Sequence, residues 1–544
     1  MGILISFALS LLLCLVLMPL LMRWADTLGL VDQPDGDRKV HSNPVPRCGG
    51  MAIALAVCFP ALFWLFDHPE LTSFFFATLI IVLFGFLDDR HELNYRWKFF
   101  GQILAVLVFF SGDITLTKTP FLGLVDLPSW LNISFWALFI LGVTNAVNLS
   151  DGLDGLAAGS SLLSLGFIVY LAFVAGEFSL VLITASTIGA LLGFLRFNTH
   201  PATVFMGDTG SQFLGFVAAC LALMVTQSAQ SAVSPLVAIA ILGLPILDTL
   251  SVILLRIYNG QSPFHPDNRH LHHQLLATGL LHYQAVAALY LLNFLLLLMV
   301  YFLRFESDAV VLSSYLLFCI ATVSLIGFFR HSAFATRRRL RLDRRERRNL
   351  LLRRWVWLYR YGGVWVQYLV GLIWLLCVAT AATPFSAVVG WVAVSAIAVS
   401  LLLLFFEAKK SLIQVRISAY FTSAFVVFLV SSDALYSALS WGEEQRQIDV
   451  LMLVLLVLLA LSIRVTRRAM FRLDTQDVLV LMVLFAAPLI AFGSADNIAT
   501  TGIVARLALL LYAVEYTINR AKNTAVINVF SMLVFILIGG RYLL

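Results

Sequence analysis

The sequence predicts an all-α polytopic membrane protein, with a core of about ten helices followed by about eight further helices. Of its 544 residues, 61% are hydrophobic and only 12% are charged, and the mean hydropathy is +0.94. Soluble domains are about half apolar and about a quarter charged, so this composition excludes a soluble globular protein. Apolar runs of about twenty residues recur along the chain, which is the length that crosses the hydrocarbon core as a helix.

The predicted spans follow one another from the N-terminus. In the first half they lie near residues 3–22, 49–66, 71–87, 98–112, 132–148, 156–175, 180–196, 209–227, 234–257 and 284–303. In the second half they lie near 309–328, 363–381, 384–406, 417–436, 449–464, 476–493, 501–518 and 525–541. The first run has no basic stretch before it and no small-residue cleavage site after it. We therefore expect a retained span rather than a signal peptide.

Charge and cysteine usage exclude several classes of function. The 6 cysteines are scattered, mostly inside apolar runs, and form no CxxC pair, so they indicate packing rather than disulfides or zinc binding. The net charge of +6 is explained by orientation in the membrane, and no nucleic-acid partner is expected.

The lysines and arginines predict the orientation of the chain. If Met1 lies outside, the loops that face the cytoplasm hold most of the cations, including Arg38, Lys39, Arg47 and the run from Arg337 to Arg354. The opposite loops are mainly acidic. It follows that the polar clusters described next are all expected on the cytoplasmic face of the membrane.

The most informative stretch runs from Asn145 to Leu156, between two apolar runs. It holds two carboxamides, Asn145 and Asn148, and two carboxylates, Asp151 and Asp154, each followed by a glycine. Hard oxygen ligands beside glycines, which let a phosphate approach the backbone closely, indicate a magnesium–diphosphate site. A single Asp-Gly would suit a hydrated loop with an N-cap, but the repeat is too ordered for that alternative.

Further polar clusters lie at other predicted helix ends on the same face. Asp88 and Asp89 close the third helix, and Lys98 begins the fourth, one turn before Gln102. Adjacent aspartates repel each other, so the pair indicates a nearby cation or metal-bound phosphate, although a helix end flanked by arginines is the alternative.

A third block runs from Phe197 to Ser211. It contains Asn198 and Asp208, and Asp208 alone would also suit the N-cap of the following helix.

Five of the chain's 10 histidines lie between His265 and His282. Zinc is the minor alternative for the block Arg269, His270, His272 and His273, since it has no cysteine and no HExxH pattern. Imidazoles beside an arginine are more naturally hydrogen-bond donors to phosphate. Lys39 and His41 belong to a basic loop after the first span that either binds phosphate or only sets the topology.

Taken together, these blocks resemble the polyprenyl-phosphate N-acetylhexosamine-1-phosphate transferases, the family of MraY and WecA. The motifs that carry the resemblance occur in order: Asp-Asp at 88–89, NxxNxxDGxDGL from Asn145, FN…PA.VFMGD.GS from Phe197, and HxHH at 270–273. The Asp-Asp-Arg and Ser-Pro-Phe sequences, with His-Leu-His-His, look closer to the WecA branch. The resemblance covers about residues 1–303.

The resemblance implies a reaction and its participants. The family transfers N-acetylhexosamine-1-phosphate, here by default GlcNAc-1-phosphate, from a UDP-N-acetylhexosamine to undecaprenyl phosphate. It releases UMP, requires Mg²⁺ with Mn²⁺ as a substitute, and initiates lipid-linked glycan synthesis.

The resemblance also assigns roles to residues. It makes Asp208 the main metal ligand, with Asp151 or Asp154 close by, and it leaves Asp88 or Asp89 to orient, deprotonate or attack as a nucleophile. The expected catalytic residues are Asp88, Asp89, Asp151, Asp154, His270, His272 and His273. The expected substrate-binding residues are Lys98, Asn145, Asn148, Asn198, Arg269, Lys39 and His41.

The rest of the chain is predicted to be a separate part. We expect a transferase core over 1–303, a helix and basic linker over 304–362, and a C-terminal multi-span domain of unknown function over 363–544. The linker's basic run suits contact with anionic membrane lipid, at about 1 kcal/mol per basic residue. A homodimer and a downstream glycosyltransferase are the protein partners left open.

A membrane transporter is the rival interpretation of the polar clusters. Transporters keep such groups near the bilayer midplane, whereas here they fall at helix ends. UMP release on adding lipid phosphate would distinguish the two.

Overall fold

The structure is a computed structural model in which two compact units are distinguished, and each is described separately. The described residues are 2–32, 44–65, 71–112, 114, 116, 118, 128–228, 230–262, 269–331, 356–380, 419, 422–423, 450–458, 509–510, 513–514 and 525–543. The first unit comprises Met1–Leu340 with Asp474–Leu479, and the second comprises Arg341–Leu473 with Val480–Leu544.

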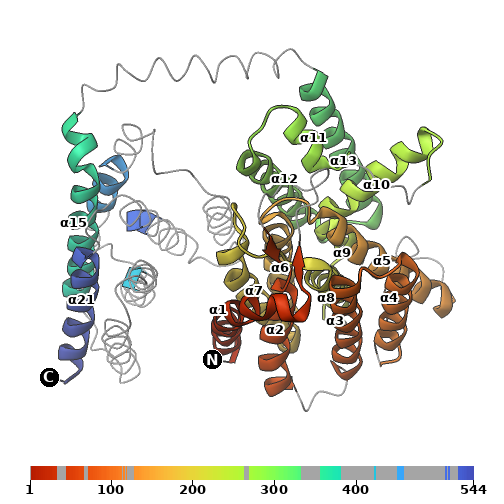
Figure 1. The fold of residues 1–544 in the computed structure, drawn as a ribbon, viewed down its shortest axis with the longest axis horizontal. Coiled ribbons are helices and arrows are strands. Elements are labelled where there is room, and N and C mark those ends of the chain that lie inside the picture. The colour runs from red at the N-terminus through yellow and green to blue at the C-terminus, as the bar shows by residue number, and fades with distance from the viewer. Residues whose placement is uncertain are drawn as a thin grey trace. The chain divides into compact units, whose positions relative to one another are not determined.

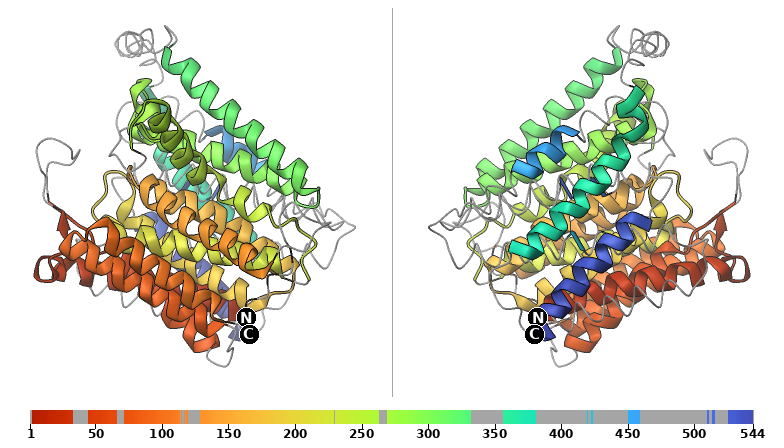
Figure 2. Two further views of the ribbon diagram at one scale, coloured as in Figure 1. Left: turned by 90° about the vertical axis from the view of Figure 1, so that its right-hand side faces the viewer. Right: turned by 90° about the vertical axis from the view of Figure 1, so that its left-hand side faces the viewer.

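The first unit is a bundle of helices that run roughly alongside one another (Figures 1 and 2). Its first helices are α1 (Gly2–Leu28), α2 (Gly49–Leu65), α3 (Thr72–His91), α4 (Tyr95–Phe110), α5 (Ser129–Ser150), α6 (Leu156–Val174) and α7 (Phe178–Asn198). They are followed by α8 (Gly207–Gln227), α9 (Val237–Ile241), α10 (Gly243–Tyr258), α11 (Leu271–Ala277), α12 (His282–Leu303) and α13 (Asp308–His331).

Helix α8 is the centre of this bundle, and glycines allow its neighbours to approach it. In an apolar stretch of 18 residues within α8, 94% of the residues are buried. A Cβ on Gly50 of α2 would lie 2.1 Å from the backbone nitrogen of Gly210, and one on Gly85 of α3 would lie 2.6 Å from Cα of Thr209. A Cβ on Gly215 would likewise lie 2.7 Å from Cα of Thr144 of α5. These backbone-to-backbone contacts place the start of α8 between α2 and α3, with α5 one to two turns further along.

The structure confirms a largely helical membrane protein. Among the described residues, eight helices are long and apolar enough to cross a membrane, and the apolar stretches Gly49–Pro60 and Val364–Val378 are shorter. The expected total of about eighteen spans stays a prediction, since the expected spans near 384–406, 476–493 and others lie wholly or mainly outside the described residues.

One local expectation needs correction. The single span expected near 234–257 is two helices, α9 and α10, which are separated at Leu242. Gly243 and Pro245 follow this break, and a proline in a first helical turn starts a helix more readily than it continues one. Between α1 and α2 in the sequence, β1 (Val31–Asp32) and β2 (Val45–Pro46) form an antiparallel pair of two residues each, which leaves the expected helical class unchanged.

Helix α13 packs against α10 within the first unit. The ring of Tyr315 is buried, and its hydroxyl donates to the carbonyl of Gly243 on α10 at 2.8 Å. Nearby, the Ser234 hydroxyl donates to Oδ1 of Asp308 at 2.5 Å. The eleventh expected span is therefore part of the same compact unit as the transferase core.

The described part of the second unit includes α15 (Val356–Thr380) and α21 (Ala525–Leu543). Tyr368 and Phe530 meet edge to face, with ring centroids 6.2 Å apart. A Cβ on Gly371 would lie 2.4 Å from the Phe530 ring, so the glycine lets these two helices pack closely.

Candidate active site

Lys98, in the first turn of α4, links two carboxylates from different helices. Its ammonium forms an ion pair with Asp88 at the end of α3 and lies 3.3 Å from Oδ2 of Asp208 on α8. The Asp88 carboxylate also accepts a hydrogen bond from the backbone N–H of Leu93 at 2.9 Å. Three predicted site residues from separate sequence blocks thus meet at one end of the bundle.

Asp89 makes a different set of contacts from its neighbour. Its carboxylate accepts hydrogen bonds from the backbone N–H groups of Asp208 at 2.7 Å and Thr209 at 2.9 Å, and from the Thr209 hydroxyl at 2.5 Å. Asp89 therefore caps the N-terminus of α8 from another helix. Gly207 has φ +72°, and a Cβ there would lie 2.7 Å from both Asp89 oxygens, so a side chain at this position would displace the cap.

One expectation is corrected here. Asp208 is not the N-cap of its helix, because α8 already begins at Gly207 and Asp208 lies in its first turn. The cation expected near the adjacent carboxylates is Lys98, which pairs with Asp88, whereas Asp89 is held by helix N–H groups.

Asn148, on the last turn of α5, holds the other oxygen of Asp208. Its Nδ2 donates to Asp208 Oδ1 at 2.5 Å and to the Ser211 hydroxyl at 2.8 Å. The Asp208 carboxylate is therefore held by groups from α4 and α5, and its side chain remains 30% exposed. It is more exposed than the side chain of Asp154, at 21%.

Asn145 lies one helical turn from Asn148 and has other partners. Its Nδ2 donates to Gln102 Oε1 at 2.7 Å and to the Leu141 carbonyl at 2.8 Å. Gln102 in turn donates to Gln212 Oε1 at 3.0 Å. This chain of carboxamides connects α4, α5 and α8 beneath the charged cluster, where Asn145 supports the helices instead of facing a substrate.

Asp151 follows the end of α5 and lies close to the other carboxylates. Burial, followed by the negative charges of Asp208, Asp154 and Asp89, raises the pKa of Asp151 to about 7. A carboxyl group in such surroundings favours binding of a cation, because a cation offsets both effects.

Asp154 contacts other groups than those that hold Asp208. Its Oδ2 lies 2.6 Å from Nδ1 of His200 and accepts from the backbone N–H of Ala202 at 3.1 Å. Among the described residues, the only group of three or more His, Cys, Asp or Glu ligand atoms within 4.8 Å of one another is Asp154, His200 and His282. The expected set of Asp151, Asp154 and Asp208 is therefore not gathered around one point in this structure.

Asn198 holds two loops together. Its Oδ1 accepts from the backbone N–H of Gly155 at 2.9 Å, and its Nδ2 donates to the Val204 carbonyl at 2.9 Å. Both ends of this buried carboxamide serve the loops that carry Asp154 and Asp208, which is a structural role in place of the expected substrate contact.

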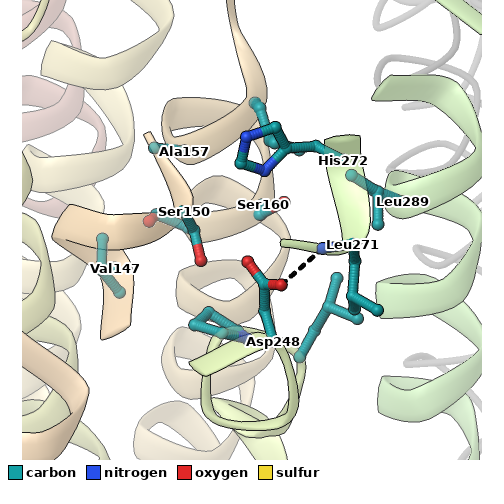
Figure 3. Close-up of a pocket in the computed structure, with 12 residues that line it drawn as sticks. Val147, Ser150, Ala157, Ser160, Asp248, Leu271, His272 and Leu289 are labelled. Carbon is teal, nitrogen blue, oxygen red and sulfur yellow. Dashed lines mark hydrogen bonds between the residues drawn. The ribbon is translucent and has the colours of Figure 1, made fainter. Parts of the chain in front are cut away.

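The histidine block begins the short helix α11 and is held by Asp248 of α10. Asp248 accepts from the Leu271 backbone N–H at 2.6 Å (Figure 3). Its other oxygen lies 3.1 Å from Nδ1 of His270. The rings of His270 and His272 are nearly parallel, with centroids 5.7 Å apart. The ring centroids of His272 and His273 are 4.2 Å apart.

His272 connects this block to the Asp151 loop. A Cβ on Gly152 would lie 2.3 Å from Nε2 of His272, so only glycine allows the imidazole to reach that backbone. Burial, followed by the charge of His273, lowers the pKa of His272 to about 4. His272 is therefore neutral near pH 7 and can offer a hydrogen bond but not a positive charge.

A small cavity lies beneath this block, among α5, α6, α10, α11 and α12 (Figure 3). Asp248, His272 and Ser150 supply polar groups to a lining that is otherwise mainly apolar. Its volume of about 30 Å³ has room for one or two water molecules, and not for a lipid chain.

The remaining predicted residues are less informative. Lys39 and His41 lie outside the described residues. Arg269 is half-buried at the start of the histidine block, where its carbonyl accepts from Gln274 at 2.7 Å.

Asp248 is absent from the predicted set, although an acid inside the apolar run 234–257 was a signal that could have identified it.

The comparisons with known proteins agree with this arrangement. Residues 71–226 match glycosyl transferase family 4. The chain is 38% identical over 315 residues to the probable undecaprenyl-phosphate N-acetylglucosaminyl 1-phosphate transferase of Bacillus subtilis (strain 168), covering 57% of this chain and 85% of that relative. It is 35% identical over 305 residues to the decaprenyl-phosphate N-acetylglucosaminephosphotransferase of Mycobacterium tuberculosis, covering 49% and 74%. It is also 34% identical over 267 residues to the phospho-N-acetylmuramoyl-pentapeptide-transferase of Acetivibrio thermocellus, covering 46% and 78%.

The fold, the site and these relatives define a membrane-embedded transferase rather than a transporter. The chain belongs to the polyprenyl-phosphate N-acetylhexosamine-1-phosphate transferase family, as its motifs predict. These three relatives match between 46% and 57% of this chain.

Proposed function

We propose that the protein transfers N-acetylhexosamine-1-phosphate, with GlcNAc as the sugar, from a UDP-sugar to undecaprenyl phosphate and releases UMP. The observation that carries this proposal is the junction of Lys98, Asp88 and Asp208, to which Asn148 adds a carboxamide. A cation, carboxylates and amide donors at one end of a membrane bundle suit phosphate chemistry at the lipid surface. The names of the Bacillus subtilis and Mycobacterium tuberculosis relatives support GlcNAc as the sugar, and the name of the former supports undecaprenyl phosphate as the lipid.

In the proposed reaction, an oxygen of the lipid phosphate attacks the phosphorus that carries the sugar. A new P–O–P bond forms, the bond from that phosphorus to the UMP oxygen breaks, and UMP leaves with the electron pair. Lys98 offsets the charge that two phosphates bring together, and positioning of this kind supplies most of the rate enhancement in phosphoryl transfer. His272 donates a hydrogen bond to a phosphate oxygen as a neutral imidazole.

The site's residues fit a magnesium ion. The cluster holds three carboxyl groups, from Asp88, Asp151 and Asp208, and Lys98 contacts two of them, Asp88 and Asp208. Carboxylate oxygens are the ligands that Mg²⁺ and Mn²⁺ prefer. Asp208 and Asp151 would hold the ion, which when bound neutralises diphosphate charge. Asp154 is a weaker candidate, because His200 and Ala202 already contact its carboxylate.

The contacts separate the roles of the two adjacent aspartates. Asp89 accepts three hydrogen bonds from the start of α8, so acting as a base or nucleophile would break the cap. Asp88 is bonded to Lys98 and to the Leu93 N–H, and exchange of its ion pair for a phosphate is a smaller change. Asp88 is therefore the residue proposed to face the acceptor phosphate, where it orients or deprotonates it.

The proposed side of the membrane is the cytoplasmic face, since UDP-sugars are cytoplasmic and the Lys and Arg distribution favours this orientation. The reaction would start the synthesis of a lipid-linked glycan at the bacterial inner membrane.

The test is a transferase assay on the purified full-length protein. Undecaprenyl phosphate, Mg²⁺ and one of several UDP-N-acetylhexosamines are supplied, and UMP and the lipid product are measured. UMP release that depends on lipid phosphate and is greatest with UDP-GlcNAc is the expected result. Release with another sugar alone would correct the substrate, and no release with any UDP-sugar would refute the proposal.

A further inference from the structure

A second cluster of ligating side chains lies beside the Lys98 junction and is not used in the proposed reaction. Asp154 is in the loop before α6, His200 follows the end of α7, and His282 is the first residue of α12. One ligand atom from each lies within 4.8 Å of the other two. The rings of His200 and His282 are stacked, with centroids 4.2 Å apart and planes inclined by 19°.

We infer that Asp154, His200 and His282 form a binding site for one divalent transition-metal ion of the zinc class, separate from the proposed magnesium site. Two imidazoles and one carboxylate are the ligand set that zinc-class ions favour, whereas Mg²⁺ takes oxygen ligands. Three protein ligands leave a fourth position for water, and the His200 side chain is 45% exposed, so an ion has a path into the site.

The present geometry needs only a small adjustment. Oδ2 of Asp154 and Nδ1 of His200 are 2.6 Å apart, and two ligand atoms on a tetrahedral zinc lie about 3.3 Å apart. This pair would open by about 0.7 Å, and the ligand atom of His282, which lies within 4.8 Å of the other two, would move closer by at most about 1.5 Å. The backbone N–H of Ala202 donates to the same Asp154 oxygen at 3.1 Å and would continue to hold the carboxylate, as partners outside a metal's own ligands commonly do.

A metal here would connect segments that lead into the active site. Asp154 is three residues from Asp151, and the loop after His200 leads to Asp208. Asn198 already joins these two segments through Gly155 and Val204, and the ion would add a link to the start of α12. Because the ion binds the folded protein, it would raise thermal stability.

The test is a titration of the chelator-treated full-length protein with Co²⁺, a spectroscopic substitute for zinc, followed by its visible absorption and by displacement with Zn²⁺. One saturable Co²⁺ per chain is expected, together with a higher Tm and no displacement by excess Mg²⁺. His200→Gln and His282→Gln should each weaken binding by at least about 10-fold.

Two variants serve as controls. His91→Gln removes an exposed histidine at the end of α3 and should leave binding unchanged. His272→Gln alters the histidine block and should also leave it unchanged. Binding that survives both His200→Gln and His282→Gln, binding that is lost in His272→Gln, or no saturable binding to wild type would each overturn the inference. Because the readout is metal binding, the result does not depend on the transferase assay.

Discussion

The backbone N–H of Asp208 donates a hydrogen bond to Oδ1 of Asp89 at 2.7 Å, so the acid that ends α3 caps the helix that carries the proposed metal ligand. The two residues are 119 positions apart in the sequence. A carboxylate at a helix N-terminus satisfies N–H groups that have no partner within the helix and interacts favourably with its dipole. This contact determines where Asp208 is placed relative to Lys98 and Asn148.

Asp208→Asn should lower turnover by about two orders of magnitude or more, because the site loses the negative charge that would hold a metal on the diphosphate. UMP release at saturating Mg²⁺ is the measurement. Asp26→Asn, which neutralises an exposed carboxylate on α1, is the matched control and should retain wild-type turnover. Unchanged turnover and Mg²⁺ dependence in Asp208→Asn would remove this residue from the metal site.

Asp89→Ala should lower stability as well as activity, since it leaves N–H groups at the start of α8 without their acceptor. The loss of a capping side chain costs about 0.5–2 kcal/mol. Thermal unfolding in detergent measures it, and Asp89→Asn, which keeps one acceptor oxygen, should lose less stability than Asp89→Ala. If Asp89→Ala unfolds at the wild-type temperature, the carboxylate is not acting as a cap.

Asp151→Asn should be more stable than wild type at high pH in the presence of EDTA. The pKa of Asp151 is about 7 in the folded protein, above its ordinary value of 3.8. Between these values the folded state binds a proton that the unfolded state releases, so the free energy of unfolding falls as pH rises. Asparagine stays neutral and avoids this loss.

The difference in Tm between Asp151→Asn and wild type should therefore grow from pH 5 to pH 8, at about 2–4 °C per kcal/mol. The same variant should lose transferase activity. A Tm difference that is independent of pH would show that Asp151 titrates normally.

His272→Ala should lower transferase activity without removing a bound transition metal, because the neutral imidazole is proposed to donate a hydrogen bond to phosphate. Its pKa of about 4 also predicts that the variant and wild type have pH–rate profiles of the same shape between pH 6 and 8. His273→Ala should also be impaired. Loss of a bound transition metal in His272→Ala would contradict the phosphate role.

Truncation should separate the two units at a defined place. A chain of residues 1–340 retains α13 and its Tyr315–Gly243 contact, and should be a folded, active transferase. A chain of residues 1–303 loses this buried tyrosine and should be unstable. Both are compared with full-length protein for monodispersity in detergent and for UMP release. A well-folded but inactive 1–340 chain would mean that the second unit completes the lipid-binding surface.

Several parts of the site could be predicted from the sequence, because they depend on features of short segments. Apolar runs of spanning length reveal helices, and the charges at their ends reveal which ends share a face. On that basis Asp88, Lys98, Asn148 and Asp208 could be expected to meet, and they do. The role of Asp248 was harder to predict from the sequence, since its partners His270 and Leu271 are more than twenty residues away.

The sequence by itself determined the class of protein, the helical membrane core and the residues that gather at one end of it, because hydropathy and motif spacing are properties of short segments. Only the tertiary structure decided how the similar side chains divide their roles. Asp89 caps a helix while Asp88 pairs with Lys98, and Asp154 faces His200 while Asp208 meets Asn148. The reason is physical: a carboxylate's role is set by the donors that surround it, and these donors come from other helices whose packing depends on contacts such as Gly85 against Thr209.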